Sequence, residues 1–213
     1  MIHSPTLTHS FISLLEKKGK LLRVYTQNID GLEVIAELPP DRIVECHGHF
    51  RSASCIDCHK SAPDMKAVVT SITQQGKPPV CTHCGGYVKP DIVFFGEGLP
   101  SRFHRLLKPD MTKADLLIVL GTSLMVAPVS MIPEMVDRQK CKRVLLNREL
   151  VGNLDLAGKK NKHNKKLQQD IFQKGDCDDS IVTLSQLLGW HDELKELHEK
   201  TKVKPAKDGK SKK

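Results

Sequence analysis

The run Leu116-Leu117-Ile118-Val119-Leu120-Gly121-Thr122-Ser123 decides the fold class of this chain of 213 residues. Consecutive apolar residues ended by a glycine and two hydroxyl residues are typical of a parallel β-strand that is buried on both faces. The run Arg143-Val144-Leu145-Leu146-Asn147 has the same character further along the chain. Because parallel strands are joined by crossover connections, both runs predict an open α/β sheet.

The segments around these two strands alternate between strand and helix patterns. Ser4-Pro5 is a typical helix start and Gly19 a typical helix end. Further strands are predicted over 21–25 and 42–46, the core pattern resumes at 92–95, and helices are predicted over 100–107, 131–138, 181–188 and 192–198. We therefore predict a Rossmann-like domain over residues 1–50 and 90–190, followed by a closing helix and a basic disordered tail over 191–213.

The composition is that of a globular protein, with 39% hydrophobic and 27% charged residues. No apolar run approaches the roughly 20 residues that cross a bilayer. The stretch from Met1 to Ser10 lacks the basic segment and apolar block of a secretory signal. These features predict a cytoplasmic protein without a membrane partner, with a nuclear share also open, in which thiols stay reduced.

The formal net charge of +8 is concentrated in two lysine-rich segments. Residues 159–166 carry +5 and residues 200–213 carry +6, so the rest of the chain carries −3. The basicity therefore belongs to a predicted loop over 151–169 and to the tail, which are expected to be solvated. No direct binding of nucleic acid is predicted.

Four of the seven cysteines form two closely spaced pairs, Cys55-x2-Cys58 and Cys81-x2-Cys84. A gap of two residues lets both sulfur atoms of a pair face one point, and two pairs complete a tetrahedron of thiolates around Zn²⁺. Free cysteines and a redox pair are the alternatives, but a redox Cys-x-x-Cys normally occurs once, at a helix start. We therefore predict that these four residues bind zinc.

The predicted zinc site is structural, because four protein ligands leave no coordination position open for catalysis. Residues 51–89, which contain it, are polar and have few large apolar side chains. Metal binding is therefore expected to hold this small module together. His59 and His83 lie inside or beside the cysteine pairs and stay open as alternative ligands, although solvent exposure is expected for both.

Three predicted strands end in polar residues, namely Gln27-Asn28-Ile29-Asp30, His47-Gly48 and Gly121-Thr122-Ser123. In an open α/β sheet, ligands bind outside the carboxyl ends of the strands. Taken singly, the histidine fits a buried core residue, and the aspartate and the hydroxyl residues fit helix caps. Taken together, the three strand ends predict one binding site at the rim of the sheet.

With the two cysteine pairs, these strand ends resemble the sirtuins, a family of NAD-dependent protein deacetylases. The resemblance runs from about Pro5 to Trp190 and keeps the order and spacing of the family's motifs. The motifs are Thr26-Gln27-Asn28-Ile29-Asp30, Glu45-Cys46-His47-Gly48, Lys89-Pro90-Asp91-Ile92-Val93-Phe94-Phe95-Gly96-Glu97, Gly121-Thr122-Ser123-Leu124 and Leu146-Asn147-Arg148-Glu149. The Lys89–Glu97 block, Gly175-Asp176-Cys177 and the ending Leu187-Leu188-Gly189-Trp190 are similar to the class I, sirtuin-2-like branch.

The resemblance implies that the chain breaks the bond between nicotinamide and ribose in NAD and transfers an acyl group from an acetylated lysine to ADP-ribose. His47 matches the family's general base, which takes a proton from a ribose hydroxyl. Histidine suits this role because it titrates near neutrality. Asn28 and Asp30 match catalytic residues that line the nicotinamide pocket, with Ile29 beside them, and Gln27 matches a ribose contact.

The resemblance also implies where the rest of NAD and the protein substrate bind. Ile29, Val93 and Phe94 match the acyl-lysine tunnel, and the segments Gly96-Glu97 and Leu124-Met125-Val126 match those that hold the substrate peptide as an added strand. The adenosine side of NAD is implied to contact Gly121, Thr122, Ser123, Asn147, Arg148, Glu149 and Cys177, with Arg148 where close relatives tend to have lysine. The implied partners are acetylated-lysine proteins of the histone or tubulin type.

The glycine-rich Gly-Ala-Gly-x-Ser turn that opens the sirtuin domain is not found in this sequence. The expectation is a sheet that lacks one central strand and has a weaker cradle for the phosphates. Two functions stay open: a deacylase that turns over, or a shortened, catalytically inactive chain that serves as a zinc-containing interaction module. The missing glycine fingerprint disfavours a dehydrogenase, and the few basic and aromatic residues near the cysteine pairs disfavour a DNA-binding ribbon.

Overall fold

The structure, a computed structural model, describes residues 3–154 and 170–202. Its helices are α1 (Leu7–Lys17), α2 (Leu32–Ile35), α3 (Met65–Gln75), α4 (Ser101–Lys113), α5 (Ile132–Met135), α6 (Cys177–Leu187) and α7 (His191–Thr201), with 3₁₀ turns η1 (Pro40–Arg42) and η2 (Val129–Met131). Its strands are β1 (Val24–Thr26), β2 (Ile43–Glu45), β3 (Gly48–Cys55), β4 (Val88–Ile92), β5 (Leu116–Leu120), β6 (Lys142–Asn147) and β7 (Ile171–Lys174). None of the described helices combines the length and apolar character needed to cross a bilayer.

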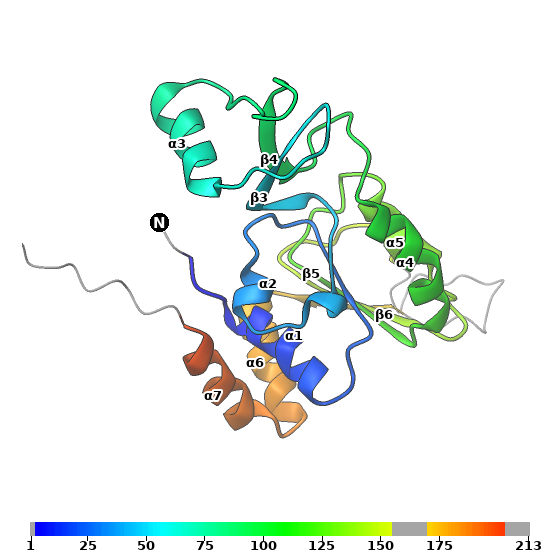
Figure 1. The fold of residues 1–213 in the computed structure, drawn as a ribbon. Helices are drawn as coiled ribbons and strands as arrows, with labels where there is room; N and C mark the ends of the chain where they lie inside the picture. Colours follow the sequence, from blue (N-terminus) through cyan, green and yellow to red (C-terminus); the bar gives the residue numbers. More distant parts are fainter. Residues whose placement is uncertain (1–2, 155–169, 203–213) are drawn as a thin grey trace, which may run out of the picture.

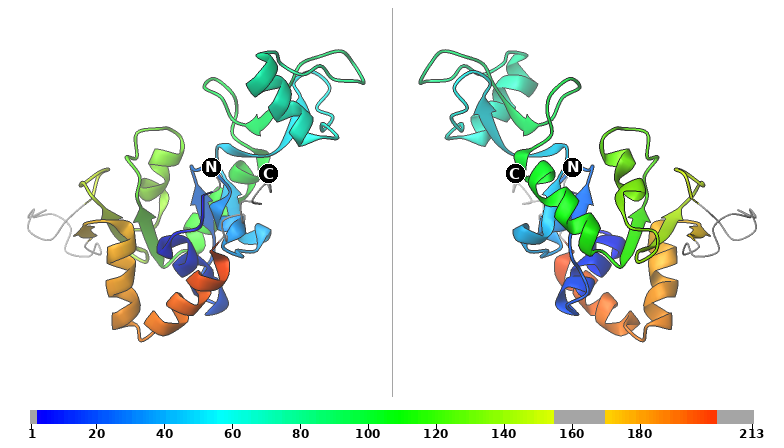
Figure 2. Two further views of the ribbon diagram at one scale, coloured as in Figure 1. Left: turned by 90° about the vertical axis from the view of Figure 1, so that its left-hand side faces the viewer. Right: turned by 90° about the vertical axis from the view of Figure 1, so that its right-hand side faces the viewer.

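The parallel strands lie between two groups of other elements (Figure 1). Helices α1, α6 and α7 gather at one end, and β3, β4 and α3 form a separate group at the other end. Both side views show this second group projecting from the rest of the molecule (Figure 2). The predicted α/β class with an inserted cysteine-bearing module is confirmed.

In the described residues the parallel strands form two sheets. Strand β1 pairs with β2, and β5, β6 and β7 form a three-stranded sheet in that order. The carboxyl ends of β1 and β5 meet through side chains, because Thr122 donates a hydrogen bond of 3.0 Å from Oγ1 to Oε1 of Gln27. The two sheets therefore present their carboxyl ends to one region.

Two apolar cores hold these sheets in place. One core packs β2 and helix α4 together through Val44, Cys46 and Phe103. The other packs α1, α6 and α7 against β6 through Phe11, Ile181 and other buried side chains. Each core buries one helical layer against one sheet, which is how an α/β fold removes apolar surface from water.

The first helix begins two residues later than predicted. Thr6 is its N-cap and forms a capping box with His9, so Ser4 lies outside the helix. The predicted end at Gly19 is close, because this glycine has a φ of +65° directly after the helix. Helix α4 extends to Lys113, well beyond the predicted 107, and α5 spans only part of the predicted 131–138.

Two predictions about buried strands were wrong. Strand β5, an edge strand of the sheet in the described residues, is not buried on both faces, because Leu116 is 48% exposed and the other four residues of the strand are only half-buried. The core pattern predicted at 92–95 ends early, since β4 stops at Ile92 and the Phe95 side chain is 98% exposed. Apolar residues after the strand are therefore free for contacts outside the core.

The module that contains the cysteine pairs has its own small core. Strands β3 and β4 pair antiparallel and, with α3, bury Ala53, Cys55, Val68 and Val88. The strand pair begins at Gly48 and ends at Ile92, a few residues outside the predicted limits of 51 and 89. Most of the predicted lysine-rich loop and of the basic tail lies outside the described residues.

Candidate functional site

His47 lies in the two-residue turn between β2 and β3, and its ring contacts the end of the neighbouring strand β1. The Nδ1 atom lies 3.1 Å from the main-chain carbonyl oxygen of Gln27. The main chain on both sides is also held, because Cys46 N–H donates to the carbonyl of Thr26 and Val93 N–H donates to the carbonyl of His47. His47 as a whole is half-buried, so it retains some exposure to solvent.

The glycine after His47 is required by its surroundings. Gly48 has a φ of +74°, and a Cβ atom at this position would lie 2.0 Å from the main-chain oxygen of Asp91. Such an approach is available only to glycine. The turn that carries His47 is therefore packed directly against the main chain at the end of β4.

The segment after β1 carries the other predicted catalytic residues. Asn28 and Asp30 are exposed, and Ile29 between them is half-buried. Asp30 accepts a hydrogen bond of 3.0 Å at Oδ1 from the N–H of Leu32, so its side chain forms an Asx turn directly before α2. The structure thus brings His47 and the start of this segment together through Gln27, with the carboxylate of Asp30 held by the helix that follows.

A third group of predicted residues follows β5 and β6. The Nδ2 group of Asn147 donates a hydrogen bond of 3.1 Å to the carbonyl oxygen of Thr122, whose hydroxyl donates to Gln27. Gly121 and Ser123 are exposed beside Thr122. Polar groups from β1, β5 and β6 therefore form one hydrogen-bonded chain along the rim of the sheets.

The residues predicted for the adenosine side lie next to this chain. The thiol of Cys177, at the start of α6, donates to the carbonyl of Leu146, and a Cβ atom on Gly121 would lie 3.2 Å from that sulfur. Burial raises the pKa of the Cys177 thiol, so it stays neutral. Arg148 is exposed and paired with Asp176, and Glu149 is exposed.

The segment predicted to bind acyl-lysine is held by a local network. Glu97 accepts a hydrogen bond of 2.9 Å at Oε2 from the N–H of Phe94, and Lys89 Nζ lies 3.1 Å from the same oxygen. Lys89 also donates to the carbonyl of Ile92 at 2.6 Å. The hydrogen bond from Phe94, assisted by Lys89, lowers the pKa of Glu97. Val93 is half-buried at the base of this network.

The second predicted peptide-binding segment is open to solvent. Met125 is 83% exposed, and Val126 and Gly96 are also exposed. Leu124 has a φ of +49°, a backbone conformation that residues with a Cβ atom rarely adopt. An exposed apolar segment of this kind suits binding of an extended peptide.

The four paired cysteines lie together as a metal site requires. Their Sγ atoms lie within 4.8 Å of one another, with Cys55 and Cys84 at 3.4 Å and Cys58 and Cys81 at 3.7 Å. Zn–S bonds of about 2.3 Å in a tetrahedron place sulfur atoms about 3.8 Å apart, so the group fits zinc. His59 and His83 are not part of this group, and the four-cysteine prediction is compatible with structural zinc.

Main-chain N–H groups within the two cysteine pairs favour the thiolate form of Cys55 and Cys81. The N–H groups of Cys84 and His83 lower the pKa of the Cys81 thiol to about 6. The N–H groups of Cys58 and Asp57 act in the same direction on Cys55 and lower its pKa. A thiolate is the form that binds zinc, so the backbone prepares the ligands.

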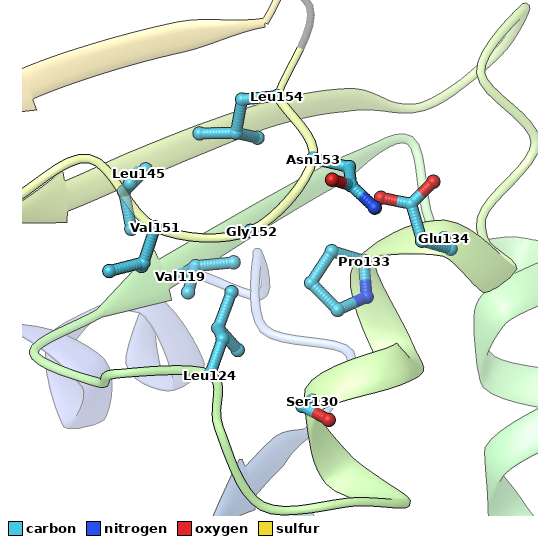
Figure 3. Close-up of a pocket in the computed structure, with 10 residues that line it drawn as sticks. All are labelled: Val119, Leu124, Ser130, Pro133, Glu134, Leu145, Val151, Gly152, Asn153 and Leu154. Carbon is cyan, nitrogen blue, oxygen red and sulfur yellow. The ribbon is translucent and has the colours of Figure 1, made fainter.

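A cavity of about 140 Å³ lies beside β5, β6 and α5 (Figure 3). Val119, Leu145 and Pro133 give it an apolar wall, and Glu134 and Asn153 stand at its polar edge. Among the residues that line it, Leu124 is the one with a predicted role. The cavity is therefore separate from the rim that carries His47.

The sequence patterns did not assign a role to two charged residues that contact the site. Lys89 contacts Glu97 and Ile92, and Arg51 on β3 forms a two-bond ion pair with Glu45. Lys89 is the first residue of the Lys89–Glu97 motif, so the sequence already indicated that it lies near the site. Arg51 has no such signal, because its partners become neighbours only when β2 and β3 are placed.

Comparisons with known proteins give a consistent result. A family model described as "Sir2 family" matches residues 2–128. NAD-dependent protein deacetylase HST2 of Candida albicans is 46% identical over 204 residues, which cover 96% of this chain and 58% of that protein. NAD-dependent protein deacetylase hst2 of Schizosaccharomyces pombe is 43% identical, with coverages of 92% and 55%. NAD-dependent protein deacetylase sirtuin-2 of Danio rerio is 41% identical, with coverages of 91% and 52%. The chain spans about half the length of these curated relatives.

Proposed function

The chain belongs to the Sir2 family, and from this premise we propose that it acts as a NAD-dependent protein-lysine deacetylase that transfers the acyl group of its substrate to ADP-ribose. The observation that supports this most is the hydrogen bond between His47 Nδ1 and the carbonyl oxygen of Gln27. It joins an imidazole to the segment that carries Asn28 and Asp30, at the carboxyl ends of parallel strands.

His47 is proposed as the general base. A carbonyl oxygen only accepts hydrogen bonds, so the bond to Gln27 requires the ring proton on Nδ1 and leaves Nε2 with a free lone pair. That lone pair takes a proton from a ribose hydroxyl of NAD. The base is thereby kept in one tautomer and one orientation before the substrate arrives, which is how a second group usually assists a catalytic histidine.

The remaining residues are proposed to bind different parts of NAD and of the acyl-lysine substrate. NAD bound at the rim supplies the nicotinamide–ribose bond that breaks and the ADP-ribose that accepts the acyl group. Asn28 and Asp30 bind and orient the nicotinamide side, and Thr122 and Asn147, which are already hydrogen-bonded to each other, orient the adenosine side. Val93 receives the acyl-lysine, and the exposed segments Gly96-Glu97 and Leu124-Met125-Val126 bind the substrate peptide.

The substrates are proposed to be acetylated lysines in proteins of the histone or tubulin type. A peptide that binds as an added strand is held mainly through its main chain, so peptides of several sequences can bind. Acetylated peptides of both types, compared by kcat/KM, test this proposal. Equal failure of both peptides, with an unrelated acetyl-peptide accepted, contradicts it.

The activity is tested by incubating the zinc-loaded chain with NAD and an acetyl-lysine peptide and measuring nicotinamide. Release is expected from the natural chain and is expected to fall about 100-fold or more in His47→Ala. His104→Ala, which changes an exposed histidine on α4, is the matched control and should behave as the natural chain. No release above that of His47→Ala rejects the enzyme and leaves the zinc-containing interaction module as the function.

A further inference from the structure

Arg51 and Glu45 form a charged bridge beside the His47 turn. Glu45 is the last residue of β2, two positions before His47, and Arg51 lies on β3, four positions after it. The guanidinium donates 2.6 Å hydrogen bonds from Nη1 to Oε1 and from Nη2 to Oε2 of the carboxylate. This two-bond geometry fixes direction as well as distance, which a single ammonium contact does not.

The same guanidinium packs on the segment that follows β1. A Cβ atom on Gly31 would lie 2.7 Å from Arg51 Nη1, so the arginine occupies the space that a side chain there would fill. Gly31 has a φ of +71° and directly follows Asp30, at the start of α2. Arg51 therefore contacts the Asn28–Gly31 segment and the strand that leads to His47 at the same time.

A second carboxylate, that of the buried Glu33, also favours the charged form of Arg51. Glu33 on α2 is 4% exposed, and its Oε2 atom has no hydrogen-bond partner among the described residues. The hydrogen bonds to Glu45 raise the pKa of Arg51, with the negative charge of Glu33 contributing in the same direction. The arginine therefore stays charged, and it is held directly by Glu45 of β2.

We propose that Arg51 is a positioning residue, which sets the distance between the His47 ring and the Asn28–Asp30 segment through its contacts with Glu45 and Gly31. This inference rests on the proposed function, in which those two groups act on one molecule of NAD. Misplacement of a reacting group by about 1 Å is enough to cost up to about 100-fold in rate. Loss of the bridge therefore slows the reaction without removing any group that touches the substrates.

The test uses the zinc-loaded full chain and four variants: Arg51→Gln, Arg51→Lys, Glu45→Gln and the double variant with glutamine at both positions. Arg51→Gln is expected to lower kcat for nicotinamide release about tenfold and to leave KM for the acetyl-peptide within about twofold. Arg51→Lys keeps the charge but not the two-bond geometry, so its kcat should lie between that of the natural chain and that of Arg51→Gln. Arg105→Gln, an exposed arginine on α4, is the matched control and should keep the natural kcat.

The double variant separates a bridge from two independent effects. If Arg51 and Glu45 act as a unit, the double variant loses about as much kcat as each single variant. A loss equal to the product of the two single losses overturns the proposal, and so does a natural kcat in Arg51→Gln. Thermal midpoints close to that of the natural chain show that the variants are folded, as expected for an arginine whose side chain is 43% exposed.

Hydrogen exchange of the main-chain amides tests the bridge without turnover. Residues 27–31 are expected to exchange faster in Arg51→Gln than in Arg105→Gln, while α6 and α7 exchange equally in both. If the natural chain releases no nicotinamide, the proposed function fails and this comparison still decides whether Arg51 holds the segment. Equal exchange at 27–31 in the two variants overturns the inference.

Discussion

The imidazole Nδ1 of His47 lies 3.1 Å from the carbonyl oxygen of Gln27, and the amide oxygen of the same Gln27 side chain accepts a hydrogen bond from Thr122. One residue therefore connects the strand ends of both parallel sheets, by its main chain on one side and its side chain on the other. Because both bonds involve Gln27, the ring of His47 and the end of β5 share one support. The candidate site is thus built across the two sheets.

Asp30 combines a structural and a proposed catalytic role, and two substitutions separate them. Asp30→Asn keeps an oxygen for the hydrogen bond to Leu32 N–H but removes the charge, so we expect nicotinamide release to fall about 100-fold with an unchanged thermal midpoint. Asp30→Ala removes this hydrogen bond as well and should also lower the free energy of unfolding by about 1 kcal/mol. Assay and denaturant unfolding of both variants provide the measurements. Full activity in Asp30→Asn would show that the charge has no role.

Zinc is expected to hold the module of β3, β4 and α3 together. The binding energy of a structural zinc is on the order of 10 kcal/mol, and the apolar core of this module is small. A chelator should therefore cause fast hydrogen exchange over residues 51–89 and leave α6 and α7 protected. Cys84→Ser should produce the same change at a lower chelator concentration. An exchange pattern that the chelator does not alter contradicts a structural metal.

Arg143 is expected to be a major contributor to stability. Its side chain is fully buried, and it bonds to Asp170, to Glu134 and to the main-chain oxygens of Pro133 and Asn153. Arg143→Met leaves Asp170 buried beside fewer positive charges, so the free energy of unfolding should fall by about 3–5 kcal/mol in denaturant titrations.

The exposed pair of Arg148 and Asp176 is the control for this prediction. Its side chains are 80% and 51% exposed, so water and salt screen their attraction. Arg148→Met is expected to unfold at the same denaturant concentration as the natural chain. Equal losses in the two variants would mean that burial does not govern the contribution of these arginines.

Tyr25 is expected to make the stability depend on alkaline pH. Its hydroxyl donates a 2.7 Å hydrogen bond to Asp110, and burial together with this bond raises its pKa above the ordinary value of about 10. A raised pKa in the folded state stabilises the fold below pH 10, and the stabilisation is lost as the unfolded tyrosine ionises above that pH.

Denaturant unfolding at pH 8, 10 and 11 compares the natural chain with Tyr25→Phe. At pH 8 the natural chain should be more stable by about 1–2 kcal/mol, because its hydroxyl bonds to a carboxylate. Above pH 10 this difference should shrink by about 1.4 kcal/mol per pH unit. A difference that is constant across the three pH values contradicts the assignment.

The sequence was sufficient for those parts of the fold whose signal is local. Strand β6 and the end of α1 follow apolar runs and a glycine, and both were predicted within two residues. Helix α3 was missed although its limits carry local signals, since Asp64 caps its start and Gly76 ends it with a φ of +62°. Its apolar residues Met65, Val68 and Ile72 have helical spacing, but they lie in a cysteine-rich segment with few large apolar side chains, where no helix was predicted.

Other features had no local signal. Strand β7 has only four residues, which are largely exposed, and its position depends on pairing with β6. The exposure of Leu116 depends on which elements pack around β5. A run of apolar residues does not reveal these neighbours. Among site residues, the roles of His47 and the cysteines came from motifs, whereas the bridge of Arg51 and Glu45 depends on tertiary contacts.

The two strands of the cysteine-bearing module connect the four cysteines to the candidate site. Strand β3 runs from Gly48, next to His47, to Cys55, one of the four predicted zinc ligands, and β4 runs back from Val88 to Ile92, next to Val93. If the ends of these strands at Cys55 and Val88 become mobile, the opposite ends at Gly48 and Ile92 are expected to lose support. Those ends lie next to His47 and to the predicted acyl-lysine segment. A metal that has no open coordination position is therefore expected to be required for the proposed reaction, and removal of zinc is expected to abolish nicotinamide release.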